Sequence, residues 1–492
     1  MNNGGPKGRR GSKSVDAPRL LAARALVSID EDAQFANLLL PKMLREEQSA
    51  NPRFSPQDAA FVSELVYGTT RRQRTLDQVL TPLSTKPLDQ LDAPVRACLR
   101  LGAYQLMYMR VPDHAAVSET VSVARELSGD GPSKTVNAVL RSLLRQGTDE
   151  ALTKAVDSVP RQYRLGIEQS HPDWIVDAFR ESLRLRGFPE TTVGEALEAN
   201  NTAAQVTLAA RPGLVDPQDL AEEAEDVLRV SAYQGNLAET SVILSGGDPG
   251  ALPSLRAGDA GVQDEGSQFA ALLLAGAPLG PGPDSKWLDL CAGPGGKAAL
   301  LAAVAKQRGA TVTANEVSPR RARLIERSVQ ALDNVTVTVE DGREIEGEDL
   351  YDRVLVDAPC LGLGSLRRRP ESRWRHSESD LDELLPLQRG LLDAGIRLAR
   401  PGGVIAWVTC SPHRSETVDQ VARVVEDGGV SLLNVYDVAA GLTLEDLRGA
   451  VSVPEGLAPT PEAVLLSSLQ LWPHIHKTDA MYIALLKKEE VE

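Results

Sequence analysis

The sequence predicts a multidomain protein that joins an all-α domain, a small α+β module and a C-terminal α/β domain. A chain of 492 residues has room for about two to four domains. Apolar residues recur at helical spacing up to residue 147, and short apolar strands alternate with helices from about residue 260. The expected divisions are a disordered tail at 1–16, the all-helical domain at 17–150, the α+β module at 151–258 and the α/β domain at 259–492.

The N-terminal tail, 1–16, is basic and rich in glycine and serine, which favours disorder. No apolar segment follows it, as a secretory signal would require. Across 17–150 the apolar spacing predicts five or six helices. One should begin at Ser55 and Pro56, since serine caps helices and proline fits the first turn. Cys98 lies on the most apolar of these helices and is expected to be a core residue.

Residues 151–258 contain both helical and strand patterns. Two helices are expected at 171–183 and 191–201, followed by strands at 204–213 and 239–246. An acidic helix at 216–230 separates these strands. The order predicts a small α+β module.

The C-terminal part alternates apolar strands of four to six residues with helices. This pattern is typical of a largely parallel sheet covered on both faces, whose ligands bind at the carboxyl ends of the strands. The expected strands lie within 286–293, 311–318, 335–342, 351–360 and 403–410.

Composition restricts the class of protein. The chain is 42% hydrophobic and 25% charged, and no apolar run reaches the roughly 18 residues of a membrane span, so no membrane partner is expected. Four cysteines in so long a chain do not suggest a disulfide framework, which favours a cytoplasmic location. No pair has C-x-x-C spacing, so no metal is expected.

The net charge of −15 is unevenly distributed, because residues 1–150 carry +3 and residues 151–492 carry −18. Basic residues gather at 7–13, 71–74 and 367–375. Local patches, rather than the net charge, contact phosphates. Any one cluster could equally be a solvated surface.

Residues 287–297, WLDLCAGPGGK, have the pattern of a strand, a glycine-rich turn and a helix start. Glycines let the backbone approach a ligand, and a helix N-terminus offers free amides. The dehydrogenase pattern G-x-G-x-x-G and the P-loop pattern are both absent. A nucleotide-like ligand is therefore favoured over a structural turn.

Acidic residues end the next strands, at Glu316, Asp341 and Asp357. A carboxylate after the second strand is well placed to accept hydrogen bonds from ribose hydroxyls. Any one of the three could instead cap a helix, but three in succession favour a ligand site, and a cationic ligand would suit it.

Two of the four cysteines, Cys360 and Cys410, end two of the expected strands. A thiol is only slightly ionised near neutral pH, so a nucleophilic cysteine needs activation. Taken alone, Cys410 could be a small strand-end residue. A Cys–His hydrolase with His413 as base is another alternative, although three residues apart on a turn is poor geometry.

The motifs CAGPGGK at 291–297, VDAPC with RRRPESRW at 356–374, and VTCSPHRSE at 408–416 resemble those of the RNA 5-methylcytosine methyltransferases of the Sun/Fmu/NOP2 family. VQDEGSQ at 262–268 resembles the segment before that family's first strand. The helices of 17–147 resemble the NusB-like RNA-binding domain of its RsmB-like branch. The resemblance covers nearly the whole chain and implies a Rossmann-like methyltransferase domain with S-adenosylmethionine (SAM) as donor.

The resemblance assigns a role to each candidate residue. Cys410 matches the nucleophile, Cys360 matches the second cysteine that helps release the product, and Lys297 would touch the target cytosine together with Asp357. The residues implied to bind SAM are Cys291, Ala292, Gly293, Pro294, Gly295, Gly296, Lys297, Glu316, Asp341 and Asp357. The residues expected to contact RNA beside the reaction centre are Arg367, Arg368, Arg369, Arg373 and Trp374.

The chain departs from the family pattern in a few places. Gly293 replaces the usual second alanine, Leu361 follows Cys360 where a small polar residue is usual, and DAMY at 479–482 replaces Asp-Gly-Phe-Phe in the family's final strand pair. None of these changes touches the implied nucleophile.

The resemblance predicts SAM-dependent methylation of cytosine carbon 5 in RNA, above all small-subunit ribosomal RNA, through a covalent cysteine adduct at carbon 6. The expected protein is a monomer whose partner is RNA. One alternative is a non-catalytic RNA-binding ribosome-assembly factor on the same scaffold, but such a factor needs none of the catalytic side chains. Another is a dinucleotide oxidoreductase, which the missing glycine pattern disfavours.

Overall fold

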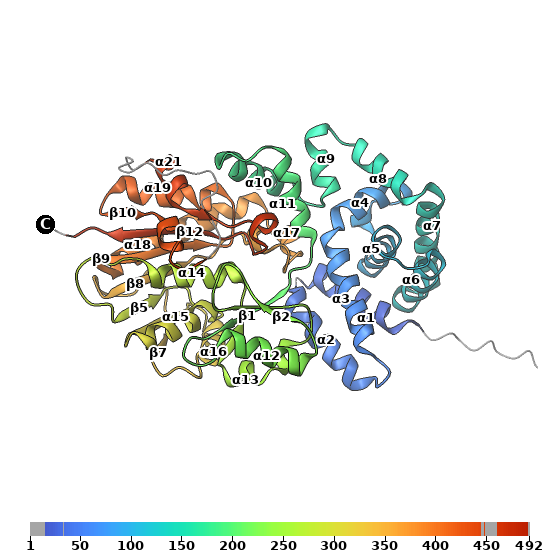
Figure 1. The fold of residues 1–492 in the computed structure, drawn as a ribbon. Helices are drawn as coiled ribbons and strands as arrows, with labels where there is room; N and C mark the ends of the chain where they lie inside the picture. Colours follow the sequence, from blue (N-terminus) through green and yellow to red (C-terminus); the bar gives the residue numbers. More distant parts are fainter. Residues whose placement is uncertain (1–14, 33, 444–446, 448–459, 491–492) are drawn as a thin grey trace, which may run out of the picture. The chain divides into compact units, whose positions relative to one another are not determined.

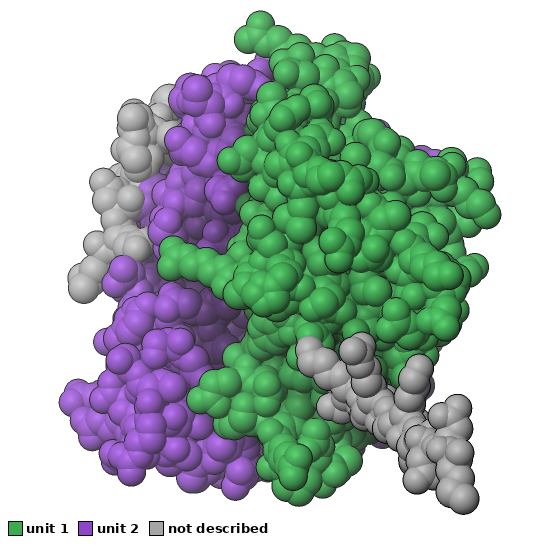
Figure 2. All heavy atoms as spheres, turned by 90° about the vertical axis from the view of Figure 1, so that its right-hand side faces the viewer, with its two compact units in different colours: residues 1–173, 369–371 green, residues 174–368, 372–492 purple. Residues whose placement is uncertain are grey.

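The computed structural model of the chain describes residues 15–32, 34–443, 447 and 460–490. Two compact units make up the chain: 1–173 with 369–371, and 174–368 with 372–492 (Figures 1 and 2). All but the last two residues of the predicted disordered tail lie outside the described residues. Within the described residues, no helix combines the length and apolar character needed to cross a membrane.

The first unit is helical, as predicted. Its helices are α1 (Ala17–Glu31), α2 (Ala36–Ala50), α3 (Pro56–Arg71), α4 (Gln73–Leu80), α5 (Ala93–Tyr108), α6 (Asp113–Ser128), α7 (Asp130–Gln146), α8 (Thr148–Asp157) and α9 (Arg161–Glu168). Ser55 caps α3, because its Oγ accepts the Asp58 N–H at 3.1 Å and the Asp58 carboxylate accepts the Ser55 N–H at 2.8 Å. Cys98 is fully buried, and burial raises the pKa of its thiol to about 12. The expected helix start and core cysteine are both confirmed.

The first unit extends beyond the predicted boundary at residue 150 and ends at Asp173. Ala151 and Ala155 on α8 belong to its hydrophobic core. Arg74 donates two hydrogen bonds, of 2.8 and 2.9 Å, to the Asp173 carboxylate. α8 and α9 present few apolar residues, so the sequence pattern does not assign them to this unit.

A small antiparallel sheet occupies the start of the second unit, with strand order β2-β3-β1-β4. The helices and strands of this part of the chain are α10 (Asp173–Leu185), α11 (Thr191–Asn201), β1 (Val206–Ala210), α12 (Pro217–Leu228), β2 (Ala232–Gln234), β3 (Ser241–Leu244), α13 (Pro253–Ala257) and β4 (Ala260–Val262). β2 and β4 are not predicted, because three residues without alternating apolar character give no strand signal. β4 lies beyond the predicted module boundary at residue 258, and its pairing with β1 extends the module to Val262.

The large sheet of the second unit has the order β10-β12-β9-β8-β5-β6-β7, and β11 pairs with β12. Its strands are β5 (Lys286–Asp289), β6 (Thr311–Asn315), β7 (Val335–Thr338), β8 (Tyr351–Asp357), β9 (Ala399–Thr409), β10 (Val430–Leu433), β11 (Leu469–Gln470) and β12 (Tyr482–Lys488). β5 to β9 are parallel, whereas the strands on the β12 side are antiparallel. β5 lies between β6 and β8, where the strand order reverses and such sheets bind ligands.

Helices cover both faces of the large sheet, as predicted (Figure 1). One hydrophobic core joins β8 to α14 (Glu265–Gly276) and α15 (Gly296–Gln307) through Leu355, and the other joins it to α18 (Leu381–Leu398) and α19 (Val418–Asp427) through Val354. The remaining helices are α16 (Pro319–Ser328), α17 (Ser372–Arg375), α20 (Val435–Ala439), α21 (Pro461–Ser467) and α22 (Pro473–His476).

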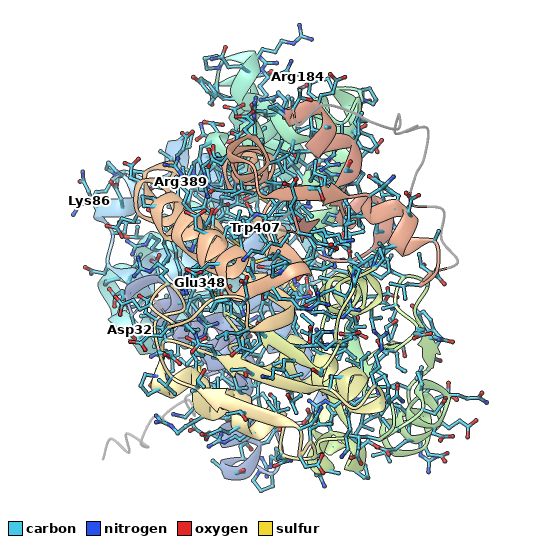
Figure 3. The ribbon with its side chains drawn as sticks, turned by 90° about the vertical axis from the view of Figure 1, so that its left-hand side faces the viewer. Asp32, Lys86, Arg184, Glu348, Arg389 and Trp407 are labelled. Carbon is cyan, nitrogen blue, oxygen red and sulfur yellow. The ribbon has the colours of Figure 1, made fainter. Side chains whose placement is uncertain are left out.

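Side chains follow the same division between inside and outside. Trp407 on β9 is fully buried, whereas Glu348 and Arg389 are exposed (Figure 3). The interior of the sheet is largely apolar, with exceptions such as the buried Arg353 on β8, which forms an ion pair of 2.9 Å with Asp284.

Candidate active site

The five parallel strands end at one edge of the sheet, and the loops that leave this edge carry the candidate residues. The glycine-rich loop follows β5, Glu316 follows β6, Asp341 follows β7, Asp357 ends β8 and Cys410 follows β9. The strand alternation thus brings residues far apart in sequence to a common edge.

The glycine-rich loop after β5 is packed too closely for side chains at two positions. A Cβ at Gly293 would lie 2.2 Å from Oε2 of Glu316. Gly295 has a φ of +111°, and a Cβ there would lie 2.9 Å from the Ile325 backbone. The glycine that departs from the family pattern therefore matches the close approach of the Glu316 carboxylate.

Glu316 is 3% exposed and is fixed by its own loop. One carboxylate oxygen accepts the Ser318 N–H at 3.0 Å, and the other lies 3.4 Å from the Arg321 guanidinium. Arg321 also donates to the Gly293 carbonyl at 2.5 Å. A carboxylate held against the glycine-rich loop fits the acceptor that a ribose requires.

Lys297 and Asp357 form an ion pair, with 2.8 Å between Nζ and Oδ2. Burial disfavours the charged lysine, but the Asp357 carboxylate and a smaller contribution from Cys410 offset this effect, and the pKa of Lys297 is raised. The predicted pair is therefore brought together, within electrostatic range of the Cys410 sulfur.

Asp289, the last residue of β5, was missed in the sequence. It is fully buried, and among the described residues no side chain donates a hydrogen bond to its carboxylate, although the Cys291 backbone N–H is near enough to favour the charged form. Burial, followed by the neighbouring Asp357 charge, raises its pKa from 3.8 to about 8. The carboxyl is therefore protonated at neutral pH. An aspartate within the apolar stretch WLDL was the signal that could have identified it.

The Sγ atoms of Cys360 and Cys410 lie 3.5 Å apart. The contact with the Cys410 sulfur and burial together raise the pKa of Cys360 well above that of a free cysteine. Cys360 therefore remains a thiol and can donate a hydrogen bond to a thiolate at Cys410.

The backbone around Gly364 holds the loop of Cys360 against the strand end of Cys410. Gly364 donates to the Cys410 carbonyl at 2.8 Å, and its own carbonyl accepts the Ala480 N–H at 2.9 Å. On the other side, the fully buried Glu416 accepts the Leu361 N–H at 2.9 Å and the Gln388 amide at 3.0 Å. Sequence reasoning did not identify Glu416, which is part of VTCSPHRSE.

Arg367 and Arg368, which were expected to contact RNA, instead pair with carboxylates inside the protein. Arg367 and Arg368 form ion pairs with the buried Asp264 and Asp479, including an Arg368 Nε to Asp479 Oδ1 distance of 3.1 Å and an Arg367 Nη2 to Asp479 Oδ1 distance of 3.3 Å. Arg367 is only 7% exposed. These two guanidiniums bind carboxylates of their own chain because the loop passes over the start of α14 and the segment before β12.

The other predicted RNA contacts have separate environments. Arg373 is fully buried and donates to the Asn201 side chain and the Asn200 carbonyl, both at 2.8 Å. Its guanidinium is therefore not at a surface. Arg369 is exposed and Trp374, on α17, is half-buried, so both are accessible to a ligand.

The surroundings of Asp341, Cys291 and His413 complete the description of the candidate residues. The Asp341 carboxylate binds its own loop through Arg343, with 2.5 Å between Nη2 and Oδ2. Cys291 is half-buried, and burial with the nearby carboxylates raises the pKa of its thiol. The His413 ring accepts the Ser415 N–H at 3.3 Å, and no hydrogen bond joins His413 to Cys410 among the described residues, so the structure offers no Cys–His pair there.

Two family models match the chain. The model described as 16S rRNA methyltransferase RsmB/F matches residues 277–487, and the NusB family model matches residues 16–145. A protein of Mycobacterium tuberculosis, named only as a methyltransferase, is 39% identical over 484 residues and aligns with 97% of both chains. Ribosomal RNA small subunit methyltransferase B of Sodalis glossinidius is 32% identical over 446 residues, which cover 87% of this chain and 94% of its own.

The fold also matches a solved structure. The protein crystallised under the name PH0851 has a TM-score of 0.74 at 20% identity, over 97% of this chain and 100% of its own. At this identity the match concerns the fold alone.

Proposed function

Because this chain belongs to the RsmB/F family of SAM-dependent rRNA methyltransferases that carry a NusB domain, we propose that it methylates carbon 5 of a cytosine in small-subunit ribosomal RNA. The resemblance of its motifs to the Sun/Fmu family is confirmed by these matches. The observation that carries the finer proposal is the 3.5 Å contact between the sulfurs of Cys360 and Cys410 beside the Lys297–Asp357 pair.

The site is suited to a cationic donor. Asp357 and Glu316 place two carboxylates beside the glycine-rich loop, each with a cation of its own chain close by, at 2.8 and 3.4 Å respectively, and Glu316 offers a fixed acceptor to ribose hydroxyls. When bound, SAM supplies a methyl group on a positively charged sulfur. Residues 291–297 would hold it, because their glycines let the backbone approach closely.

Carbon 5 of cytosine is too weak a nucleophile to take a methyl group unaided. Addition of the Cys410 thiolate to carbon 6 forms an S–C bond and moves electron density onto carbon 5 and the ring nitrogen. The Lys297–Asp357 pair donates a hydrogen bond or a proton to that nitrogen. Carbon 5 then accepts the methyl group and gives its proton to solvent, and the electron pair of that C–H bond restores the ring double bond and expels the sulfur as the thiolate of Cys410.

Cys360 serves a different step. Its raised pKa keeps it protonated while Cys410 attacks, so it stabilises the neighbouring thiolate by a hydrogen bond. In the adduct it lies beside the same sulfur and can donate a hydrogen bond to that sulfur as the S–C bond breaks, which assists release. The cytosine must be single-stranded or flipped out, because a stacked base exposes neither face to a thiolate.

The test separates the two cysteines. Cys360→Ala is expected to accumulate a protein–RNA complex that survives denaturing electrophoresis when 16S rRNA and SAM are present. Cys410→Ala should form no complex and no 5-methylcytosine, while its SAM affinity by titration calorimetry stays unchanged. The Cys360→Ala/Cys410→Ala double variant is the control and should lose the complex.

Two outcomes contradict the proposal. A trapped complex with Cys410→Ala instead would make Cys360 the nucleophile. Wild-type activity in both single variants would exclude covalent catalysis, and SAM and RNA binding without any methyl transfer would favour a non-catalytic assembly factor.

A further inference from the structure

A cavity of about 310 Å³ lies behind the glycine-rich loop, between the small sheet and the helices α15 and α16. Arg211 and Gln263 from the small sheet line one side, and Leu300, Leu324 and Arg327 from the two helices line the other. This volume is at the lower end of ligand pockets. Pro294 and Gly296 of the glycine-rich loop also line the cavity, but the methyl-transfer reaction described above uses none of the five side chains just named.

Arg211 is the main chemical feature of the cavity. Its side chain is 5% exposed, and it donates to the Gly258 carbonyl. Burial lowers its pKa to about 10 and the nearby Asp259 charge opposes this effect, so it stays charged at neutral pH. Among the described residues Arg211 forms no direct ion pair, and Asp259 compensates its charge only at longer range. The guanidinium can therefore bind an anion that enters the cavity.

Arg327, on α16, adds a second positive charge. It is exposed and forms no ion pair within the described part of the chain. Two guanidiniums from elements more than 100 residues apart thus line the same cavity. Arginine binds phosphate well, because its N–H groups match the oxygens in pairs.

The walls narrow the choice of ligand further. Leu324, which is 42% exposed, and Val262, which is 53% exposed, give the cavity apolar surface that a bare phosphate does not require, and Gln263 offers both a donor and an acceptor. A flat heterocycle with a phosphate has this combination of an apolar face, a polar edge and a negative charge. A nucleotide therefore matches the cavity in size, charge and surface.

We propose that this cavity is an RNA subsite that holds one nucleotide flanking the target cytosine, with its phosphate on Arg211 and Arg327 and its base against Leu324 and Val262. The inference rests on the proposed RNA substrate. Gln263 connects the two sites in the chain, because the next residue, Asp264, binds the loop that follows Cys360.

The experiment measures binding of a 16S rRNA transcript by fluorescence anisotropy over a range of salt concentrations. Arg327→Glu is expected to weaken binding roughly tenfold and to reduce the salt slope by about one, because a phosphate contact is lost. Arg323→Glu is the matched control: it makes the same charge change on α16 at an exposed position outside the cavity, and its effect should be several-fold smaller.

A second variant tests the cavity without a change of charge. Leu324→Trp fills the cavity from a position that is already 42% exposed, so the fold should tolerate it, and RNA affinity should fall. SAM affinity by calorimetry should stay within about twofold in all three variants. Equal losses in Arg327→Glu and Arg323→Glu, or an unchanged RNA affinity in Leu324→Trp, would overturn the inference.

The two proposals fail in distinguishable ways. If the wild-type protein makes no 5-methylcytosine, the proposed function fails. If the wild type methylates the transcript and Arg327→Glu behaves like Arg323→Glu, only the subsite fails. Free 5′-nucleotides are a further arm: tight binding of CMP or AMP that Leu324→Trp abolishes, with RNA affinity unchanged, would assign the cavity to a free nucleotide and overturn the RNA subsite.

Discussion

Replacing Gly364 with alanine is expected to separate the two cysteines. An added Cβ would lie 2.0 Å from the Ala480 carbonyl oxygen and 3.0 Å from the Cys410 carbonyl carbon. Both atoms belong to the backbone, so no side chain can rotate away. Ordinary contact begins near 3.4 Å, so the loop or the strand end must move by roughly 1.4 Å.

The expected loss of stability follows from two effects. Overpacking of a close contact costs about 1–3 kcal/mol. The movement also breaks the hydrogen bonds of 2.8 and 2.9 Å through which Gly364 joins Cys410 and Ala480, at about 1 kcal/mol each. The free energy of unfolding should therefore fall by about 3–5 kcal/mol. A displacement near 1 Å at reacting groups costs about 10²-fold in rate.

The assay is urea unfolding together with single-turnover methylation of a 16S rRNA transcript. Gly246→Ala is the matched control, because a Cβ there meets no atom within 4 Å. It should change stability by less than about 0.5 kcal/mol and leave the rate unchanged. Equal stability and equal rates in the two variants would refute the argument that Gly364 holds the cysteines together.

Three further predictions concern charged groups. Glu316→Gln should weaken SAM binding by about 1–3 kcal/mol in calorimetry, because ribose hydroxyls lose a charged acceptor; unchanged affinity would remove Glu316 from the site. Arg368→Ala should destabilise the protein by about 3–5 kcal/mol in urea unfolding, because it leaves buried carboxylates uncompensated, and a loss of RNA affinity alone would contradict the buried pairing. Asp289→Asn should remove a pH dependence: the folded pKa of about 8 exceeds the ordinary 3.8, so the wild type binds more protons when folded and loses stability as pH rises between these values. The variant should therefore gain stability relative to the wild type between pH 5 and 8, and a constant difference would contradict the raised pKa.

The order of strands and helices in the C-terminal part could be predicted because apolar runs mark parallel strands directly. Strand ends then place Glu316, Asp357 and Cys410 at one edge without any tertiary information. The short strands β2 and β4 could not be predicted, since they form only by pairing with β3 and β1. A strand of three residues is too short to show the alternation of apolar and polar residues that would predict it.

The site contains groups whose role depends on burial rather than on residue type. Asp289 and Glu416 are among the many carboxylates of the chain, and only the folded structure shows that both are fully buried. The motifs distinguish Cys360 from Cys410, but only the folded structure shows that their sulfurs are in contact and that this contact, together with burial, raises the pKa of Cys360. These properties depend on the environment of each side chain, which the sequence pattern does not encode locally.

The arginines beside Cys360 show why a charge cluster in a sequence does not identify a nucleic-acid surface. Arg367 and Arg368 compensate Asp264 and Asp479, two carboxylates brought to them by segments about 100 residues away on either side. Their charge is used inside the protein, where it fixes the loop that carries Cys360. A phosphate needs a guanidinium that the chain itself leaves unpaired. Arg327, which is exposed, and Arg211, which no carboxylate of the described residues contacts directly, meet that condition better than the arginines beside Cys360 do.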